Sequence, residues 1–421
     1  MYFWYKFITY LLYPFAPIYL YFRKLRKKED FYRYKEKLSI IKQRREDEFL
    51  IWIHMASVGE AMSVLPLIEN FIQNKKIGKI LLTSITLSSS KIIEKKFKNE
   101  KKIVHQFSPL DIPFIVKKFL NHWKPNLSIF IDSEIWPNLI IETNNQKIPL
   151  LLVNARITNK TFVKWKLFTK FAKKIFEKFS LCIVSNNESE DFLKILGAKN
   201  IKNYGNLKFS SLQNEKNLQL DGDFLNIIKN KKIWCAASTH SGEEKFCAYV
   251  HASIKKSYEN ILTIIIPRHI ERIEKIKKDL FNLNLKIALF SKFKDVDDET
   301  DILLVDSYGE ALKFYNISKC VFLGKSLVDK LAKDSGQNPI EPARLGCKIY
   351  HGPNVSNFDE IYKYLNDLGV TQEVKDPKEL GLLMVEEMKN NDDKNLNISE
   401  KLKNHGQTIF NNVIMELKKY I

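Results

Sequence analysis

Short apolar runs alternate with amphipathic stretches from residue 49 onward, and this pattern constrains the fold more than any other feature. Such alternation is typical of repeated βα units, which form a parallel sheet. A first series of predicted strands covers residues 50–54, 79–84, 103–107, 127–132, 150–154 and 181–185. A second series covers residues 233–237, 261–266, 286–290, 302–305, 320–323 and 348–351. Between strands, residues 60–73 place Leu65, Ile68 and Ile72 on one helical face.

The two series predict two Rossmann-like domains, which also suits a chain of 421 residues. The polar segment 210–221 is the best linker candidate. We expect an anchor with its basic flank (1–28), a first domain (29–212), a second domain (213–400) and a C-terminal helix (401–421) that can pack back on the first domain. In α/β proteins of this kind, ligands bind at the carboxyl ends of strands, facing the cleft between the domains.

The N-terminus, MYFWYKFITYLLYPFAPIYLYF, is apolar and aromatic, and a basic cluster at residues 23–28 follows it. A secretory signal would place its basic residues first and offer a small-residue cleavage site, and this segment does neither. Lys6, Pro14 and Pro17 interrupt the run, so its length is marginal for a full span. We expect a monotopic or marginally spanning anchor, with the body in the cytoplasm. The alternative is a hydrophobic helix packed on the protein's own core.

The chain has 68 Lys and Arg against 49 Asp and Glu, a net charge of +19 that favours anionic partners. Only nine of the basic residues are Arg, and no zinc-finger spacing or RNA-binding signature occurs, so nucleic acid is not expected as a partner.

The five cysteines form no C-x-x-C pair, which indicates a reducing compartment and buried free thiols. The D-x-D pairs at 221–223 and 295–297 lie in polar stretches that we interpret as solvated loops, so no metal is predicted.

Candidate catalytic residues follow two strands of the first series. After strand 50–54, a turn containing Ser57 and Gly59 leads into a helix with Glu60 in its first turn, where free N–H groups face the cleft. After strand 127–132, Glu134 precedes a helix that Pro137 is suited to begin. Two carboxylates on facing loops can serve as a general base and a second group that stabilises charge. The plain alternative is that Glu60 only stabilises the helix dipole.

Strand ends of the second series carry candidates for binding an anion. Ser238, Thr239 and His240 follow strand 233–237, although a capping box formed with the glutamates at 243–244 would also explain them. Arg268 follows strand 261–266, and its planar guanidinium suits phosphate.

Two further strand ends open helices. The segment 307–310 follows strand 302–305, and Gly336 precedes a helix whose first turn is expected to carry Asn338 and Glu341. A helix N-terminus binds phosphate, and a Glu in the following turn can accept hydrogen bonds from ribose hydroxyls. No P-loop and no G-x-G-x-x-G fingerprint occurs. Together the strand ends indicate an enzyme with a nucleotide site.

Seven motifs, in order and at matching approximate spacing up to about residue 365, resemble the 3-deoxy-D-manno-octulosonic acid (Kdo) transferases of lipopolysaccharide synthesis. They are Trp52-Ile53-His54 through Ser57-Val58-Gly59-Glu60, Glu134-Ile135-Trp136-Pro137-Asn138, Asn154-Ala155-Arg156, Gly205-Asn206-Leu207-Lys208-Phe209, Ser238-Thr239-His240 with Gly242-Glu243-Glu244, Pro267-Arg268-His269, and Asn338-Pro339-Ile340-Glu341-Pro342. The resemblance implies a GT-B fold, inverting transfer from CMP-Kdo to a lipid A precursor without a cofactor, and anchoring among anionic lipids at the cytoplasmic face of a bacterial inner membrane.

Carried over by position, the resemblance implies that Glu60 is the proton acceptor and that Glu134 and Lys208 stabilise the transition state. The CMP contacts it implies are Pro267, Arg268, Gly309, Glu310, Ala311, Asn338, Pro339, Ile340 and Glu341. Two positions depart from the family pattern: Gln337 stands where His is common, and Lys325 where a second Gly often follows Gly324.

Two other functions remain as alternatives at this point. The first is a different GT-B transferase or a sugar epimerase that acts on another activated sugar. The second is a membrane-bound, nucleotide-sensing assembly factor without turnover, which would leave the Glu60 and Glu134 pair without a task.

Overall fold

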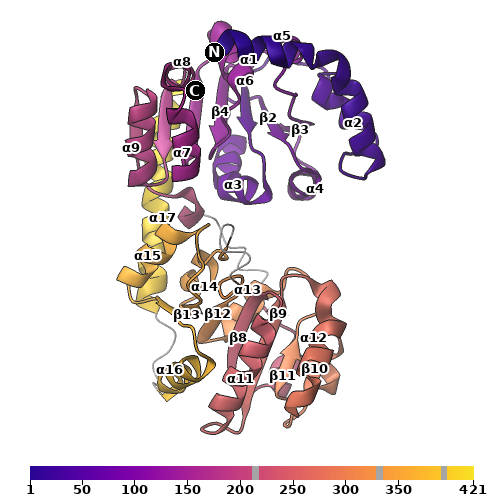
Figure 1. Ribbon diagram of the computed structural model, residues 1–421, viewed down its shortest axis with the longest axis vertical. Helices are drawn as coiled ribbons and strands as arrows, with labels where there is room; N and C mark the ends of the chain where they lie inside the picture. The colour runs from indigo at the N-terminus through magenta and orange to yellow at the C-terminus, as the bar shows by residue number, and fades with distance from the viewer. Residues whose placement is uncertain (211–217, 329–334, 390–395) are drawn as a thin grey trace. The chain divides into compact units, whose positions relative to one another are not determined.

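The computed structural model describes residues 1–210, 218–328, 335–389 and 396–421 (Figure 1). The chain divides into two compact units, unit 1 (Met1–Leu212 with His405–Ile421) and unit 2 (Gln213–Asn404). The expected domain boundary at 212/213 and most of the expected linker fall on residues 211–217, outside the described residues.

Unit 1 contains a seven-stranded parallel sheet with the order β3-β2-β1-β4-β5-β6-β7. The strands are β1 (Leu50–His54), β2 (Lys79–Ser84), β3 (Ile103–Phe107), β4 (Leu127–Ile131), β5 (Leu150–Ala155), β6 (Leu181–Val184) and β7 (Ile201–Asn203). The six predicted strands are confirmed to within a residue at each end. The additional strand, β7, is a short polar segment at the sheet edge, where one strand face need not be apolar.

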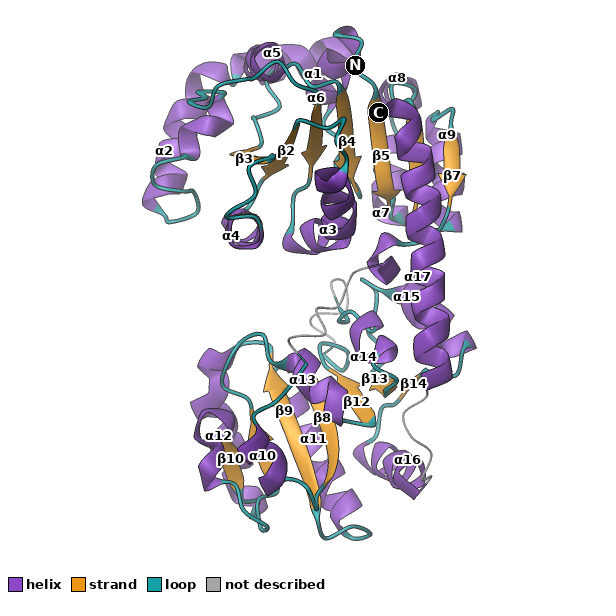
Figure 2. Cartoon of the chain, turned by 180° about the vertical axis from the view of Figure 1, so that it is seen from behind, coloured by secondary structure: helices purple, strands orange, loops and turns teal. Residues whose placement is uncertain are grey.

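Helices connect the strands of unit 1 and cover its sheet (Figure 2). They are α3 (Val58–Gln73), α4 (Leu87–Lys96), α5 (Pro113–Trp123), α6 (Pro137–Asn145), α7 (Asn159–Lys166), α8 (Thr169–Phe176) and α9 (Asn187–Leu196), with η3 (Leu207–Ser210) after β7. The core between sheet and helices is built from large side chains such as Trp52, Trp123 and Phe130, all at most 2% exposed.

The C-terminal helix α17 (Leu396–Leu417) reaches unit 1 from His405 onward. The Tyr204 hydroxyl donates to Glu416 Oε1 at 3.0 Å. A Cβ added to Gly406 would lie 2.1 Å from the carbonyl oxygen of Phe209 in η3, so only glycine allows this helix to approach so closely. The helix therefore supports the segment that carries Lys208.

Unit 2 contains a second seven-stranded parallel sheet, with the order β10-β11-β9-β8-β12-β13-β14. The strands are β8 (Lys232–Thr239), β9 (Ile261–Pro267), β10 (Ile287–Leu289), β11 (Ile302–Leu304), β12 (Cys320–Leu323), β13 (Lys348–His351) and β14 (Thr371–Glu373). The helices are α10 (Gly222–Ile227), α11 (Glu243–Lys255), α12 (Ile273–Leu280), α13 (Ala311–Ile317), α14 (Ile340–Arg344), α15 (Asp359–Asp367) and α16 (Pro377–Lys389). The six predicted strands are present, and the polar edge strand β14 is again additional.

The five cysteines lie in described segments, where all are buried and none forms a disulfide. Burial raises the pKa of the Cys182 thiol to about 12 and raises those of Cys235 and Cys247 well above the ordinary value. The prediction of free core thiols is confirmed.

The N-terminal segment forms two short helices, α1 (Tyr2–Leu11) and α2 (Ala16–Leu25), and α1 lies against α5 (Figure 1). The Tyr5 hydroxyl donates to Asp111 Oδ2 at 2.7 Å, which fixes α1 to unit 1. Within the described part of the chain, we find no helix with the length and apolar character needed to cross a bilayer. The alternative of packing on the protein's own core is met in part: Tyr2 of α1 lies against the unit 1 core, and Ala16 and Leu20 of α2 are buried, whereas the other large apolar side chains of the two helices are mostly exposed.

Each sheet has a topological switch point, which lies between two central strands. The strands that come earlier in the chain lie on one side of this point, and the later strands lie on the other side. In unit 1 it lies between β1 and β4, and in unit 2 between β8 and β12. Ligands of such sheets bind outside the carboxyl ends of the strands at this point.

Candidate active site

Glu60 lies at the unit 1 switch point, in the first turn of the helix that follows β1. Its Oε2 accepts the N–H of Ala56 at 2.7 Å and its Oε1 accepts the hydroxyl of Ser57 at 2.8 Å, while Ser57 caps the Glu60 N–H at 3.3 Å. This reciprocal capping box holds the carboxylate in one orientation. A capping role and a chemical role are thus both compatible with Glu60.

The electrostatic surroundings of Glu60 suit a base. Burial, with the negative charges of Glu134 and Asp132, raises the pKa of Glu60 to about 7, although the hydrogen bonds from Ala56 and Ser57 act in the opposite direction. A carboxylate with a pKa near neutral pH is both available as a base and strong enough to accept a proton.

Glu134 follows β4 and is 9% exposed. Its Oε2 accepts the indole N–H of Trp136 at 2.6 Å and lies 3.2 Å from Nε2 of His54. Burial alone would raise the pKa of Glu134, but the interactions with His54 and Trp136 outweigh it and hold that pKa below its usual value. The two carboxylates therefore have pKa values displaced in opposite directions, the pattern that separates acid and base roles in active sites.

Lys208 belongs to the same cluster. It lies on η3, whose position depends on Asn154, because Asn154 Oδ1 accepts the buried N–H of Leu207 at 2.9 Å. Asn154 has a left-handed backbone (φ 56°) at a bulge in β5. Burial lowers the pKa of Lys208, while the charges of Asp132 and Glu60 raise it. Lys208 is therefore within electrostatic reach of Glu60.

Three residues to which the sequence analysis gave no role complete the unit 1 cluster: His54, Asp132 and Arg156. Asp132 has a left-handed backbone (φ 58°) at the end of β4, and burial raises its pKa against the lowering charges of Lys208 and Arg156. Arg156 directly follows β5. The motifs containing His54 and Arg156 were visible in the sequence, but neither showed its spatial partner: His54 meets Glu134, which follows the non-consecutive strand β4, and Arg156 meets Asp132, about 24 residues earlier.

The switch point of unit 2 is organised by Glu243, which is 1% exposed. Its carboxylate accepts four backbone N–H groups, from His240 (2.8 Å), Lys325 (2.7 Å), Ser326 (2.9 Å) and Leu327 (3.0 Å). Glu243 thereby ties the loop after β8 to the loop after β12. The expected capping-box alternative is wrong, because Gly242 is the N-cap of α11 and no described side chain caps that helix.

The three expected residues after β8 differ in accessibility. Thr239 is fully buried and donates to Glu244 Oε1 at 2.9 Å, and Arg272 holds both oxygens of Glu244 at 3.0 Å. Ser238 and His240 are half-buried, and His240 Nδ1 lies 3.1 Å from the Ser238 carbonyl oxygen. Thr239 thus supports the loop, while Ser238 and His240 remain accessible.

The expected CMP contacts occupy three strand ends of unit 2. Pro267 is buried at the end of β9, and the following Arg268 is exposed and fixed through its own N–H to the Thr239 carbonyl at 3.0 Å. After β11, Gly309 has a left-handed backbone (φ 90°) with open space where a Cβ would stand. Glu310 is the N-cap residue of α13, and Ala311 is the first residue of that helix.

The third strand end corrects one expectation. Helix α14 begins at Ile340, so Asn338 precedes the helix and is not in its first turn. Asn338 Oδ1 instead accepts the N–H of Ile340 at 3.2 Å, and Pro339 is the N-cap residue. Glu341 does lie in the first turn, and burial raises its pKa despite the opposing charge of Arg344.

Comparison with known proteins identifies the family. Residues 32–211 match the family model described as 3-deoxy-D-manno-octulosonic-acid transferase (kdotransferase). The curated 3-deoxy-D-manno-octulosonic acid transferase of Rickettsia bellii is 36% identical over 377 residues, which are 89% of this chain and 88% of the relative. The chain belongs to the Kdo transferase family. The Aquifex aeolicus member is 32% identical over 330 residues, 78% of this chain and 83% of its own length.

Solved structures give the fold of this Kdo transferase family member. A UDP-GlcNAc 2-epimerase from Neisseria meningitidis, bound to UDP-GlcNAc, superposes with a TM-score of 0.59 at 12% identity, covering 88% of this chain and 100% of the epimerase chain. This likeness, with the two parallel-sheet units, supports the GT-B architecture. At such low identity it supports the fold alone, and the sequence relatives decide the family.

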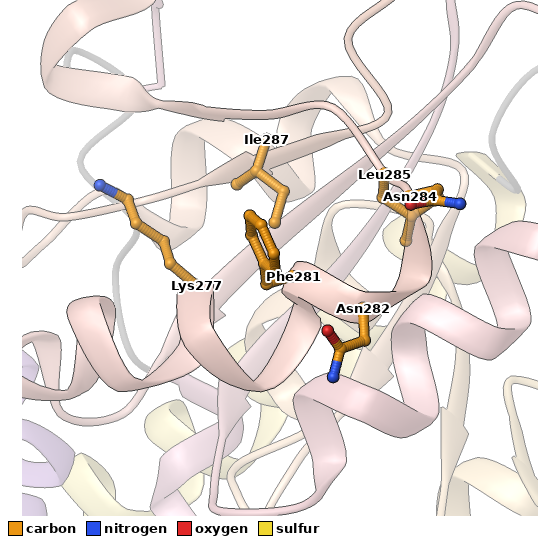
Figure 3. Close-up of a pocket in the computed structure, with 6 residues that line it drawn as sticks. All are labelled: Lys277, Phe281, Asn282, Asn284, Leu285 and Ile287. Atoms are coloured by element: carbon orange, nitrogen blue, oxygen red, sulfur yellow. The ribbon is translucent and has the colours of Figure 1, made fainter.

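The pocket drawn in Figure 3 lies apart from these candidates within unit 2. Lys277, Phe281, Asn282, Asn284, Leu285 and Ile287 line a hollow of about 570 Å³. Ile287 is the first residue of β10, so the pocket is at the amino end of that strand, whereas the expected donor contacts follow carboxyl ends. Among the residues that the structure describes, no three His, Cys, Asp or Glu side chains gather as a metal site would require.

Proposed function

We propose that this Kdo transferase moves Kdo from CMP-Kdo to a lipid A precursor with inversion at the anomeric carbon. The acceptor oxygen forms a bond to that carbon as the bond to the CMP phosphate breaks, and CMP leaves with the electron pair. Glu60 takes the proton of the acceptor hydroxyl. The observation that carries this proposal is the Glu60 carboxylate, whose pKa is raised to about 7 beside the ionised Glu134.

A base is needed because a sugar hydroxyl is a poor nucleophile, and a positioned base contributes about 10² to 10⁴-fold in rate. Lys208, in the same cluster, supplies positive charge that can offset the charge developing in the transition state. Glu134 keeps a negative charge that raises the proton affinity of Glu60.

On the donor side, we assign CMP-Kdo to the strand ends of unit 2. Arg268 is exposed and presents a guanidinium that can pair with two phosphate oxygens. Because the positive charges of Arg268 and Lys208 can balance the leaving phosphate, we propose transfer without a catalytic metal. Exhaustive chelation is expected to leave the rate within about twofold, and a loss restored only by a divalent ion would contradict this part of the proposal.

The decisive experiment for the base is Glu60→Gln, which keeps the shape and loses the proton-accepting charge. We expect a loss of about 10² to 10⁴-fold in kcat with CMP-Kdo still bound. Glu69→Gln is the matched control, since Glu69 lies on the same helix and pairs with Lys96 at 3.0 Å. Near-normal transfer by Glu60→Gln would remove Glu60 from this role. Mass spectrometry of the product from CMP-Kdo and a tetraacylated acceptor, with UDP-sugars as competing donors, tests the substrates.

We also propose that α1 and α2 hold the protein at the cytoplasmic face of the bacterial inner membrane, where the anionic acceptor lies. Large apolar side chains on these helices and on the turn between them are exposed, namely Phe3, Trp4, Phe7, Ile8, Tyr10, Leu11, Phe15, Ile18, Tyr19, Tyr21, Phe22 and Leu25. Basic residues at 23–28 follow them and suit anionic headgroups.

Vesicle sedimentation tests this membrane role. Serine at Phe3, Trp4 and Phe7 together removes an exposed ring cluster from a helix that buries none of its residues, so folding is expected to survive. Binding to vesicles with anionic lipid should fall at least about tenfold. Phe281→Ser is the control, because Phe281 is 81% exposed in unit 2. Equal binding by the triple variant and the control would contradict the assignment.

A further inference from the structure

His54 is the last residue of β1 and is completely buried. Its Nδ1 lies 2.9 Å from Thr83 Oγ1 on the neighbouring strand β2, and its Nε2 lies 3.2 Å from Glu134 Oε2 after the other neighbour, β4. The ring thus bridges the switch point, with one nitrogen toward a hydroxyl and the other toward a site carboxylate.

The hydrogen bonds around Thr83 bear on where the ring proton lies. Trp52 Nε1, which can only donate, gives its N–H to Thr83 Oγ1 at 2.8 Å. Thr83 Oγ1 therefore accepts on that side, and its own hydroxyl proton is available for His54 Nδ1. When Thr83 donates that proton to Nδ1, the proton of a neutral His54 lies on Nε2, the nitrogen beside Glu134.

The Nε2 atom of His54 has Glu134 as its polar neighbour. It makes no hydrogen bond of good geometry to any atom of the described residues, so its contact with Glu134 is a short electrostatic contact and not a well-aligned bond. A buried ring nitrogen without a good partner is costly. Because His54 has no exposed surface, it cannot take a proton from an acceptor sugar directly, and any influence on transfer passes through Glu134.

We propose that His54 is a positioning residue, which orients the Glu134 carboxylate and keeps it negatively charged beside Glu60. The inference rests on the proposed function only in assigning the base to Glu60. The chain of contacts runs from Trp52 through Thr83 and His54 to Glu134, whose Oε2 also receives the Trp136 indole N–H.

Several charges face this chain from other elements. Glu60 lies on α3, Asp132 directly follows β4, and Asp111 precedes α5. Burial raises the pKa of Asp111, while the Tyr5 hydroxyl and the backbone N–H groups of Leu139 and Asn138, which donate to it, act to lower that pKa. Lys208 and Arg156 act on Asp132 from the other side. Without His54, Glu134 would take up a proton more readily, its charge would no longer raise the proton affinity of Glu60, and Glu60 would become a weaker base.

The test measures kcat, KM and the pH dependence of kcat/KM for His54→Leu and His54→Gln in the full chain. We expect His54→Leu to lower kcat about 10- to 100-fold, the range for loss of a supporting partner of a site residue. In the pH profile of kcat/KM, the acid limb, where the rate rises as Glu60 loses its proton, should move to lower pH by about 0.5 to 1 unit. His54→Gln keeps a donor near Glu134 and should recover part of the rate. Thr83→Val leaves His54 in place and should shift the limb in the same direction by less.

The control is His105→Gln. His105 is a buried histidine in the same sheet, 8% exposed, with its Nε2 2.9 Å from the hydroxyl of Ser84, and within the described residues it does not contact Glu134. It should leave the acid limb unmoved. If His54→Leu lowers kcat without moving the limb, or moves it no more than His105→Gln does, the inference is wrong and the role of His54 is structural.

A second readout separates this inference from the proposed function. The ¹³C chemical shift of the Glu134 carboxyl, followed by NMR against pH, reports its ionisation without any turnover. We expect its titration to move to higher pH in His54→Leu. Should Glu60→Gln remain active while this shift occurs, the base assignment fails and the His54 inference stands; an unchanged Glu134 titration overturns the inference whatever the activity of Glu60→Gln.

Discussion

The switch points of the two sheets both have a glutamate at the start of a helix, yet the two carboxylates differ in their surroundings. Glu243 in unit 2 accepts four backbone N–H groups and is 1% exposed. Glu60 in unit 1 accepts two hydrogen bonds from its own capping turn and remains partly exposed, with a pKa raised to about 7. Position at a switch point is therefore not enough to make a carboxylate reactive. What distinguishes them is how much of the accepting capacity the protein itself uses.

The comparison also explains how unit 2 can accept the anionic donor that we propose with a glutamate so close by. The charge of Glu243 is surrounded by N–H dipoles, and Ser238 and His240, on the loop after β8, are only half-buried. In unit 1 the negative charges of Glu134 and Asp132 instead act on Glu60. Glu243 joins two loops, whereas the role that we propose for Glu60 is to accept a proton.

The largest effect is expected from removing the structural carboxylate. Glu243→Ala leaves four backbone N–H groups, one of them buried and three part-buried, without their acceptor, which should lower the free energy of unfolding of unit 2 by about 3 to 5 kcal/mol. Hydrogen exchange at β8 and β12 in the full chain measures it. Glu60→Ala, which loses only a capping interaction, should cost about 1 kcal/mol in unit 1. Similar losses in the free energy of unfolding for the two variants would contradict the distinction between Glu243 and Glu60.

A smaller effect is expected at the support of Lys208. Gly406→Ala places a Cβ against the Phe209 carbonyl, so α17 or η3 must move. We expect kcat to fall about tenfold and unit 1 to lose about 1 to 3 kcal/mol in stability. Gly222→Ala is the control, because nothing lies within 4 Å of the added carbon there. If both variants behave alike in thermal unfolding and kcat, α17 does not position Lys208.

The smallest effect is expected at Lys325, where the family often has glycine. Lys325 adopts a left-handed backbone (φ 59°) while its N–H donates to Glu243. Lys325→Gly removes that backbone strain and should raise the stability of unit 2 by about 1 kcal/mol in denaturant unfolding. Lys313→Gly, inside α13, should lower it by a similar amount. A loss of stability in Lys325→Gly would mean that the lysine side chain supports the loop.

Apolar periodicity predicted most of the fold because strands buried on both faces are continuous apolar runs. It missed β7 (Ile-Lys-Asn) and β14 (Thr-Gln-Glu), which are polar edge strands held by pairing with one neighbour. The positions of Glu60 and Glu134 followed from strand ends and from the family motifs. Their catalytic roles stay predictions.

Other parts of the site were beyond sequence reasoning because they depend on contacts between distant segments. Glu243 binds a loop more than 80 residues later in the chain, so its local pattern looked like a capping box. His54 meets Glu134 only because β1 pairs with β4. Asn154 positions η3 through its side chain and has a left-handed backbone. The apolar periodicity of the sequence does not predict a backbone conformation of this kind.

The central claim is that Glu60 must lose its proton before it can act, and the pH dependence of kcat/KM tests it most directly, because this ratio reports groups of the free enzyme. With the pKa of Glu60 at about 7, kcat/KM should rise roughly tenfold per pH unit below that value and level off above it. Glu60→Gln should have a low rate without this limb. A profile that is flat between pH 5 and 8, or a limb that persists in Glu60→Gln, would contradict the account.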